Sequence, residues 1–308
     1  MSLHPSWLAL VALVPAAATW WTGRRLLRRL DDPALPELLL QRRSRIGALW
    51  GLTLFAILVL DARQAAWAIP LMLVAMLVAD YPAQRVLLDE RWSLRAYLWH
   101  SLRRLAGGIA MWVVLVVAPS VVLGARDTRT ATLLAAGFAA TLLLWLHHYR
   151  RIWLWTHGAT PLGARPGLDE RFAAVMAKAT TTPPLLYRFG QPGERRAAAF
   201  ALPSAGHTGA VVFSDALLEL LTADEVAAVF AHEVAHLEQH TPRRMRRLRI
   251  VSSLLIVAIL ALSLEGQRWA PGAHPFLSLG CGVAVVVALS VRASRSKRHE
   301  TESDLRGA

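Results

Sequence analysis

The strongest constraint on this fold is a set of seven apolar stretches, most of them close to the length of a membrane-spanning helix. A bilayer core requires about 20 apolar residues per helical span. Hydrophobic residues make up 55% of the chain and charged residues 18%, which is too apolar for a soluble globule. The sequence therefore predicts a polytopic helical membrane protein. The candidate spans are residues 5–22, 46–60, 66–79, 107–123, 131–149, 250–264 and 276–291, and the short pair 46–60 and 66–79 has a single re-entrant hairpin as its alternative.

The basic residues predict how these spans are oriented. The formal charge is +13, and 17 of the Lys and Arg residues lie in three segments, 23–45, 80–106 and the tail after 291, against four in the loops of the opposite side. Basic loops stay in the cytoplasm. We expect an N-terminus outside, a cytoplasmic C-terminus and a location in the plasma (inner) membrane. Membrane orientation explains the positive charge, so nucleic-acid binding is not expected.

One long segment between the fifth and sixth spans has the composition of a folded soluble domain. The flanking spans place it in the cytoplasm. We predict a predominantly α protein with about seven spans and a small α+β cytoplasmic insert. Its parts are a five-span membrane region (1–149), the insert (150–249), two further spans (250–291) and a C-terminal tail (292–308).

The insert contains alternating short elements. Turn-forming Pro and Gly residues separate an amphipathic helix from three short strands. Thr222 and Glu225 form a capping-box pattern that predicts the start of a final helix near Ala223. The expected elements are a helix at 168–179, strands at 185–189, 197–202 and 209–213, and a short helix at 214–221.

The final helix carries an H-E-x-x-H motif formed by His232, Glu233 and His236. The two histidines lie one turn apart on one helix face, so both imidazoles can reach one tetrahedral metal ion. Zinc is the expected ion, with one per chain, and Glu233 is placed to take a proton from the attacking water. Phe230 and Val234 give the helix an apolar opposite face. The alternative is a pair of ordinary helix histidines solvated near the membrane surface.

A third protein ligand is needed to complete such a site. His240 follows one turn later but lacks the spacing of an extended zinc motif, which favours a polar helix-end residue. In the tail, Glu300 and Asp304 share a helix face at i, i+4, so one carboxylate could bind metal while the other hydrogen-bonds a ligand histidine. A solvated charged terminus is the alternative for this tail.

These motifs resemble a known family. The stretch 211–240, VVFSDALLELLTADEVAAVFAHEVAHLEQH, is similar to the zinc-site region of the integral-membrane metalloendopeptidases that include HtpX and the type I CAAX prenyl endopeptidases, and the tail 296–304 resembles their E-x-x-x-D element. The resemblance implies a zincin-like insert with Glu300 as third ligand and Asp304 in support. Five spans before the zinc helix look more like the prenyl endopeptidase branch.

Two departures from the family pattern affect the site. Ala198, Ala199, Phe200 and Ala201 stand where relatives often carry Asn-Ala-Phe-Ala, so alanine replaces the amide. We predict that these four residues bind substrate as an edge strand, and a plain core strand is the alternative. The chain also stops four residues after Asp304, which indicates an abbreviated tail or a fragment.

The predicted function is a membrane zinc endopeptidase with Glu233 as general base. Its partners would be the lipid bilayer and a peptide or membrane-protein substrate; quality control, processing of a lipidated C-terminus and the oligomeric state stay open. A non-catalytic sensor or receptor is the alternative, although a structural zinc site needs no base. A transporter is disfavoured because Asp61, Asp80 and Glu265 lie at span ends.

Overall fold

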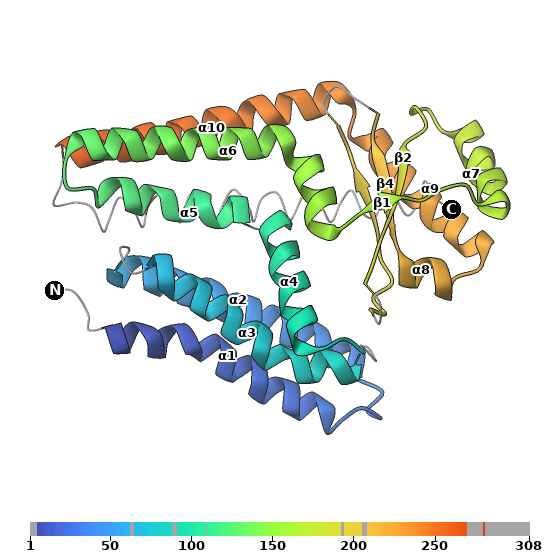
Figure 1. The fold of residues 1–308 in the computed structure, drawn as a ribbon, viewed down its shortest axis with the longest axis horizontal. Helices are drawn as coiled ribbons and strands as arrows, with labels where there is room; N and C mark the ends of the chain where they lie inside the picture. Colours follow the sequence, from blue (N-terminus) through green and yellow to red (C-terminus); the bar gives the residue numbers. More distant parts are fainter. Residues whose placement is uncertain are drawn as a thin grey trace. The chain divides into compact units, whose positions relative to one another are not determined.

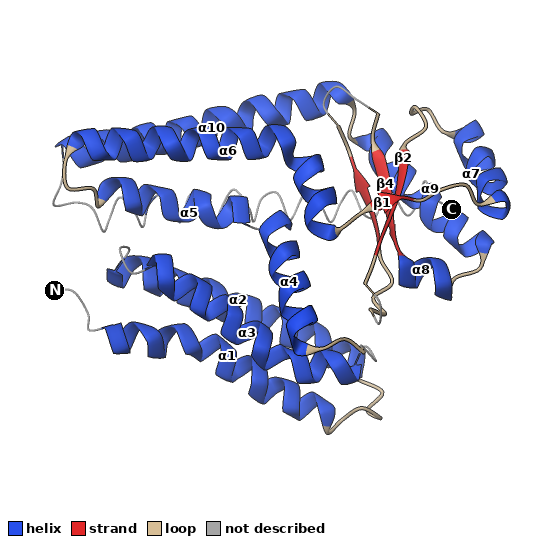
Figure 2. Cartoon of the chain, viewed as in Figure 1, coloured by secondary structure: helices blue, strands red, loops and turns tan. Residues whose placement is uncertain are grey.

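The computed structural model is predominantly helical and contains one small sheet (Figures 1 and 2). The described residues form two compact units, which divide between Leu142 and Leu143 and again between Ile256 and Val257. This architecture agrees with the predicted fold class of apolar helices and a small α+β insert. The structure describes residues 5–61, 65–87, 91–108, 110–191, 194–204, 208–269 and 280.

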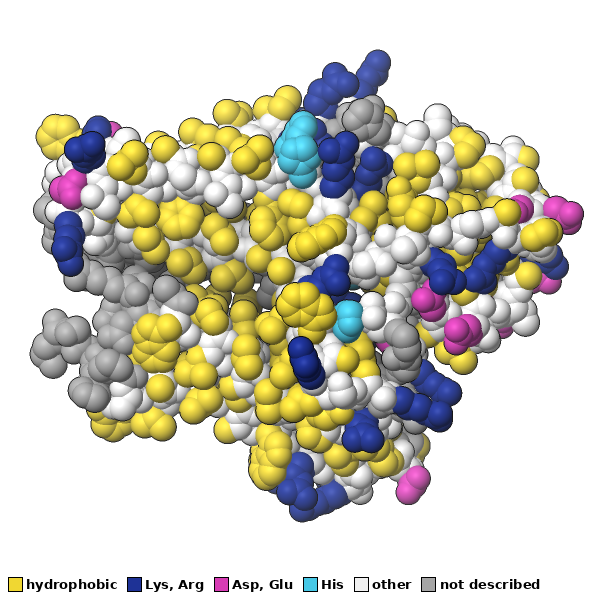
Figure 3. All heavy atoms as spheres, viewed as in Figure 1, with side chains coloured by type: hydrophobic (Ala, Val, Ile, Leu, Met, Phe, Trp, Pro, Cys, Tyr) yellow, Lys and Arg dark blue, Asp and Glu magenta, His cyan; other side chains and the backbone are white. Residues whose placement is uncertain are grey.

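The long helices expose apolar side chains that a soluble protein would bury. Trp7, Leu133 and Leu254 are 62%, 66% and 64% exposed, and hydrophobic side chains cover much of the face seen in Figure 3. Such a surface is suited to lipid. The helices are α1 (Pro5–Leu27), α2 (Leu35–Asp61), α3 (Ala65–Leu87), α4 (Leu94–Gly108), α5 (Ala110–Leu123), α6 (Thr128–His157) and α10 (Pro242–Trp269).

The helices of the described residues account for at most five of the seven predicted spans. In the described part of the chain, four are long and apolar enough to cross a bilayer, within α1, α3, α6 and α10, and the bent pair α4 and α5 is a possible fifth. The predicted span 46–60 lies within α2, which is not among them. Residues 46–60 and 66–79 belong to helices of 27 and 23 residues, and the re-entrant hairpin stays an alternative for this pair. The predicted span 276–291 lies outside the described residues, apart from residue 280.

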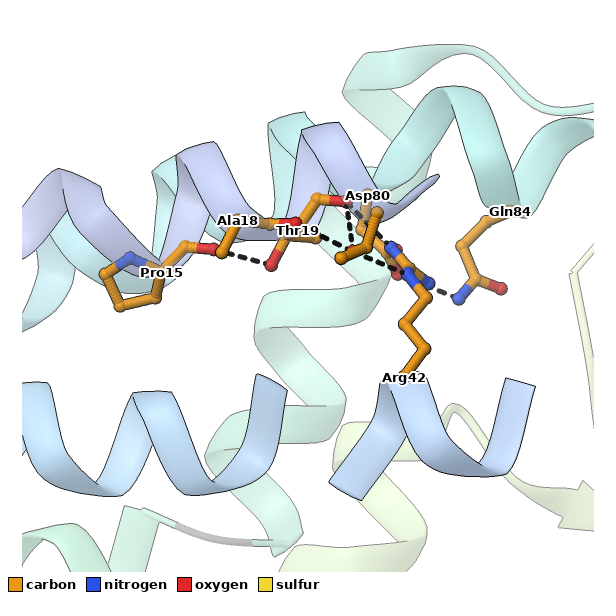
Figure 4. Close-up of polar contacts among 7 residues, drawn as sticks. Pro15, Ala18, Thr19, Arg42, Asp80 and Gln84 are labelled. Carbon is orange, nitrogen blue, oxygen red and sulfur yellow. Dashed lines mark hydrogen bonds and ion pairs between the residues drawn. The ribbon is translucent and has the colours of Figure 1, made fainter. Parts of the chain in front are cut away.

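A partly buried ion pair joins the first three helices (Figure 4). Nη2 of Arg42 in α2 lies 2.6 Å from Oδ1 of Asp80 in α3 and donates to the carbonyl of Thr19 in α1 at 3.1 Å. Gln84 donates to the other oxygen of Asp80 at 2.8 Å. Asp80 therefore helps to hold the three helices together, and it lies within the candidate span Trp67–Leu87 and not at its end.

The insert folds around a four-stranded mixed sheet (Figure 2). Its strand order is β1-β2-β4-β3; β2 and β4 are parallel, and the two outer pairs are antiparallel. Three helices accompany the sheet. The bounds are β1 (Thr160–Pro161), α7 (Pro166–Lys178), β2 (Leu185–Phe189), β3 (Ala199–Leu202), β4 (Ala210–Ser214), α8 (Asp215–Leu220) and α9 (Ala223–Gln239).

The central strand β4 is buried on both faces. Val211 and Phe213 belong to a core shared with α7 and α9, whereas Val212 packs in a second cluster with Trp153 of α6. Alternation of side chains along a strand sends neighbouring residues to opposite faces. An uninterrupted apolar run is therefore what a central strand with cover on both sides requires.

The predicted elements of the insert are close to those observed. The strand at 185–189 has the predicted bounds, and the strands predicted at 197–202 and 209–213 are β3 at 199–202 and β4 at 210–214. The helix predicted at 168–179 begins earlier, because Pro166 takes a first-turn position where its missing N–H is not needed.

Candidate metal centre

The histidine helix α9 begins with the predicted capping box. The Thr222 hydroxyl accepts from the backbone N–H of Glu225 at 3.4 Å, and the Glu225 carboxylate accepts from the Thr222 N–H at 2.7 Å. The bond from the Thr222 N–H, together with a bond that the Thr222 hydroxyl donates at 2.8 Å, stabilises the carboxylate and lowers the pKa of Glu225. The reciprocal bonds satisfy two N–H groups that the first turn would leave unpaired.

The apolar face of α9 is buried as predicted. Phe230, Val234 and Leu237 are 1%, 3% and 6% exposed. The ring of Phe230 lies 4.3 Å from that of Phe172 in α7, and the same aromatic cluster includes Phe213 of β4. The helix is therefore held against both α7 and the central strand, which leaves its polar side to carry the motif.

A glycine permits α9 to approach the sheet closely. A Cβ atom on Gly209, the residue before β4, would lie 2.9 Å from a methyl carbon of Leu237. Carbon atoms in contact are normally about 3.5–4.0 Å apart. A larger residue at position 209 would therefore require the Leu237 side chain to shift.

The two motif histidines converge. Nε2 of His232 lies 3.1 Å from Nε2 of His236, and the rings meet edge to face with centroids 4.7 Å apart. Two imidazole nitrogens bound to one tetrahedral zinc at about 2.0–2.1 Å would be about 3.3 Å apart. The pair therefore has nearly the spacing that a shared zinc ion requires, and its donor chemistry fits that ion.

The motif carboxylate lies on the same helix in a largely dry environment. Glu233 is 8% exposed. A buried glutamate is unusual, because a charged side chain away from water normally has a partner or a function. Glu233 directly follows His232 in the sequence, within the predicted motif.

His240 ends α9, as the sequence predicts. Its backbone N–H donates to the carbonyls of His236 and Leu237, each at 3.2 Å, and its Nδ1 lies 2.8 Å from the His236 carbonyl. A carbonyl only accepts, so Nδ1 carries the proton and donates. The residue thus closes the helix end next to a motif histidine.

The predicted third ligand and its support lie outside the described residues. This holds for both Glu300 and Asp304. Within the described part, no three His, Cys, Asp or Glu side chains are grouped closely enough to hold a metal. Two imidazoles alone do not complete a zinc site.

The predicted substrate strand lies at one edge of the sheet and packs against α9. Ala199 and Ala201 pack against the core on the α9 side, whereas Phe200 contacts Trp153 and Phe189 on the other. The carbonyl of Ala198 accepts from Ser214 N–H at 2.8 Å. Antiparallel partners alternate between bonded and non-bonded pairs, so the backbone groups of Ala199 and Ala201 point away from β4.

Sequence reasoning missed the role of Ser214. Its hydroxyl accepts from Leu217 N–H at 3.1 Å, capping α8, and from Ala198 N–H at 2.9 Å, fixing the start of β3. The serine preceding a helix signals the cap. No local pattern signals a second bond to a residue 16 positions away.

Two comparisons relate this chain to known proteins. Residues 166–308, which include α7, the sheet strands after it, α9 and the tail, match the model of Peptidase family M48. The fold is similar to that in the crystal structure of S. mikatae Ste24p, with a TM-score of 0.53 and 11% sequence identity. That likeness covers 97% of this chain and 87% of the other.

Proposed function

Because residues 166–308 belong to peptidase family M48, we propose that the protein is a membrane-embedded zinc endopeptidase. The observation that carries the proposal is the convergence of His232 and His236, 3.1 Å apart at Nε2, with the buried Glu233 between them in the sequence. A purely structural metal site has no use for a carboxylate in that position, so the arrangement favours catalysis over a sensor that keeps the fold.

The metal set is proposed as one zinc ion held by His232, His236 and Glu300. Asp304 supports the set by a hydrogen bond to a ligand histidine, in the manner of carboxylates behind zinc-bound imidazoles. Bound zinc supplies Lewis acidity to the scissile carbonyl and to water. Replacing Asp304 by alanine should then lower affinity or activity by roughly 10 to 100-fold, without abolishing the site.

Proton transfer is assigned to Glu233. Its carboxylate accepts a proton from the attacking water and later delivers it to the amine of the leaving peptide. Burial at 8% exposure keeps competing bulk water away from the carboxylate. The same residue therefore acts first as base and then as acid.

Substrate positioning is assigned to the open edge of β3. An extended peptide can pair with the outward backbone groups of Ala199 and Ala201 as an additional strand. The methyl side chains at these positions allow close approach. The amide that relatives carry at the position of Ala198 is absent, so positioning relies on the backbone here.

The substrate is proposed to be a peptide or a membrane protein, cut on the cytoplasmic side. Exposed apolar helices support a membrane location, and the distribution of basic loops supports this orientation. Neither feature selects between general proteolysis and processing of a lipidated C-terminus.

The decisive experiment compares Glu233→Gln with a matched change on the same helix. Glu238 accepts a hydrogen bond from the Thr180 hydroxyl at 2.9 Å, a bond that glutamine can still accept. Glu233→Gln should retain zinc and lose turnover of a casein-like substrate, whereas Glu238→Gln should keep both. Comparing cellular protein termini with and without Glu233→Gln would identify the bonds cut. Wild-type turnover by purified Glu233→Gln would exclude the assigned base.

A further inference from the structure

The helix that follows the histidine helix begins with a cluster of exposed arginines. Arg243, Arg246 and Arg247 lie in the first two turns of α10 and are exposed. Within the described part of the chain, none of the three forms an ion pair, and the first turn of α10 contains no acidic residue. The positive end of the helix dipole adds to this charge. The cluster therefore carries charge that the described residues leave uncompensated.

The three arginines occupy one face of the helix. Arg243 and Arg247 are one turn apart, and Arg246 lies beside them. Ile250 and Leu254 follow Arg243 and Arg247 by seven residues each, which is nearly two full turns. Both are exposed, at 54% and 64%. The arginine face thus continues directly into an exposed apolar stripe.

The opposite face of α10 is buried. Ile256, Ile259 and Leu260 are 3%, 6% and 3% exposed. Arg249 precedes Ile256 by seven residues, so it belongs to this inward face and is only half exposed. The apolar stripe below the three arginines therefore faces outward, which is the lipid side of a helix apolar enough to span a membrane.

From this alignment we infer that Arg243, Arg246 and Arg247 bind the phosphate groups of anionic phospholipids at the membrane surface. The position of the arginines identifies lipid as the ligand. Lipid headgroups lie directly above the acyl chains that would contact Ile250 and Leu254. Guanidinium groups match phosphate by forked, charge-assisted hydrogen bonds. Clusters of basic residues next to a span are attracted to anionic lipids for the same reason.

The lipid site is tied to the candidate metal centre. One side-chain nitrogen of Arg244 donates to the carbonyl of Gln239, the last residue of α9, at 3.0 Å. Only His240 and Thr241 separate the two helices, and His240 bonds back to the His236 carbonyl. Lipid bound by the arginine face would hold the end of the histidine helix at the headgroup level. The inference about lipid itself does not depend on the proposed peptidase activity.

The test measures lipid preference next to the arginine face. A fluorophore on a cysteine replacing Leu254, with Cys281 changed to serine, is placed in nanodiscs containing either brominated phosphatidylglycerol or brominated phosphatidylcholine. Quenching reports which lipid occupies the stripe. We expect stronger quenching by the anionic lipid, and Arg247→Gln should reduce that preference about fivefold. High salt should weaken the preference as well.

Arg249→Gln is the matched control, since it removes the same charge two residues away on the inward face. It should leave the lipid preference unchanged, and Arg247→Lys should largely retain it. Arg243→Gln provides a second loss variant if Arg247→Gln does not fold. Equal quenching by both lipids in the parent protein, or an equal loss in Arg249→Gln, would overturn the inference. Displacement by inorganic phosphate at constant ionic strength would do so too, by identifying a soluble-anion site.

Discussion

Proline substitutions at Ala198 and Ala199 can distinguish an effect on substrate docking from an effect on fold stability. Ala199 is the first residue of β3, and Ala198 precedes it. Ala198 and Ala199 carry the same side chain, yet their N–H groups point in opposite directions: that of Ala198 donates to Ser214 Oγ at 2.9 Å, and that of Ala199 points away from β4. Proline removes an N–H and is tolerated at an edge when that group faces outward. Ala199→Pro should therefore remove a docking bond, whereas Ala198→Pro should remove a structural one.

The expected change in kcat/KM follows from the net free energy of one hydrogen bond. An amide bond contributes about 0.5–1.5 kcal/mol net. Its loss should therefore lower kcat/KM of Ala199→Pro about two- to thirteen-fold. Strand pairing is present in both the bound substrate and the transition state, so the change should appear in KM with kcat nearly constant. Ala198→Pro should instead lower the free energy of unfolding by a similar amount, because the Ser214 hydroxyl loses a donor.

The assay is peptide cleavage by the purified full chain, with zinc content and thermal unfolding measured on each variant. Ala199→Pro should keep zinc and stability while its KM rises. Docking at this edge would be refuted if Ala199→Pro had normal peptide kinetics while Ala198→Pro lost cleavage only in proportion to its loss of folded protein. Position 199 would then be part of a plain core strand, the alternative that the small side chains allow.

Three further outcomes can be checked. We expect Glu300→Ala to lose most of its zinc and Glu302→Ala to keep it, because side chains two positions apart in a helical tail would point about 200° apart; metal analysis giving the reverse would overturn the tail assignment. Cysteines placed at Arg126 and Arg195, in a chain lacking its native cysteine, should label from outside only at 126 with an impermeant reagent, and the opposite result would invert the topology. The pKa of Glu225 is lowered in the fold, so its contribution to stability is present above the unfolded pKa and is lost as pH falls through the folded value; the stability difference from Glu225→Gln, followed by thermal unfolding, should shrink in acid, and a pH-independent difference would exclude the ionised cap.

The local chemistry of α9 is predictable from sequence because each part has a short spacing. His232 and His236 are four residues apart, and Thr222 and Glu225 are three apart, so helix geometry alone brings each pair together. Strand β2 is also predictable locally, because its short segment is bounded by proline and glycine. Features of this kind require no knowledge of the tertiary fold.

Other features depend on contacts that no local pattern contains. The two-residue strand at Thr160–Pro161 is too short to show alternation and exists only because β2 is beside it. The end of α6 at His157 lies eight residues beyond the predicted span, since helical hydrogen bonding continues after the apolar stretch ends. A span predicted from hydrophobicity ends where the apolar residues end, whereas the end of a helix is set by capping and packing.

The position of the histidine pair relative to β3 results from three separate attachments of one helix. The capping box fixes the first turn of α9, Phe230 fixes its middle against α7 and β4, and the bond from Arg244 to the Gln239 carbonyl fixes its last turn. Ser214 independently fixes the start of β3 on the same central strand. Because both the helix and the strand edge are anchored to β4, the distance between the candidate metal centre and the candidate docking edge is set by the sheet. A scaffold of this kind can hold an extended peptide and the histidines in register without a contribution from the side chains of β3, which agrees with alanine at 198, 199 and 201.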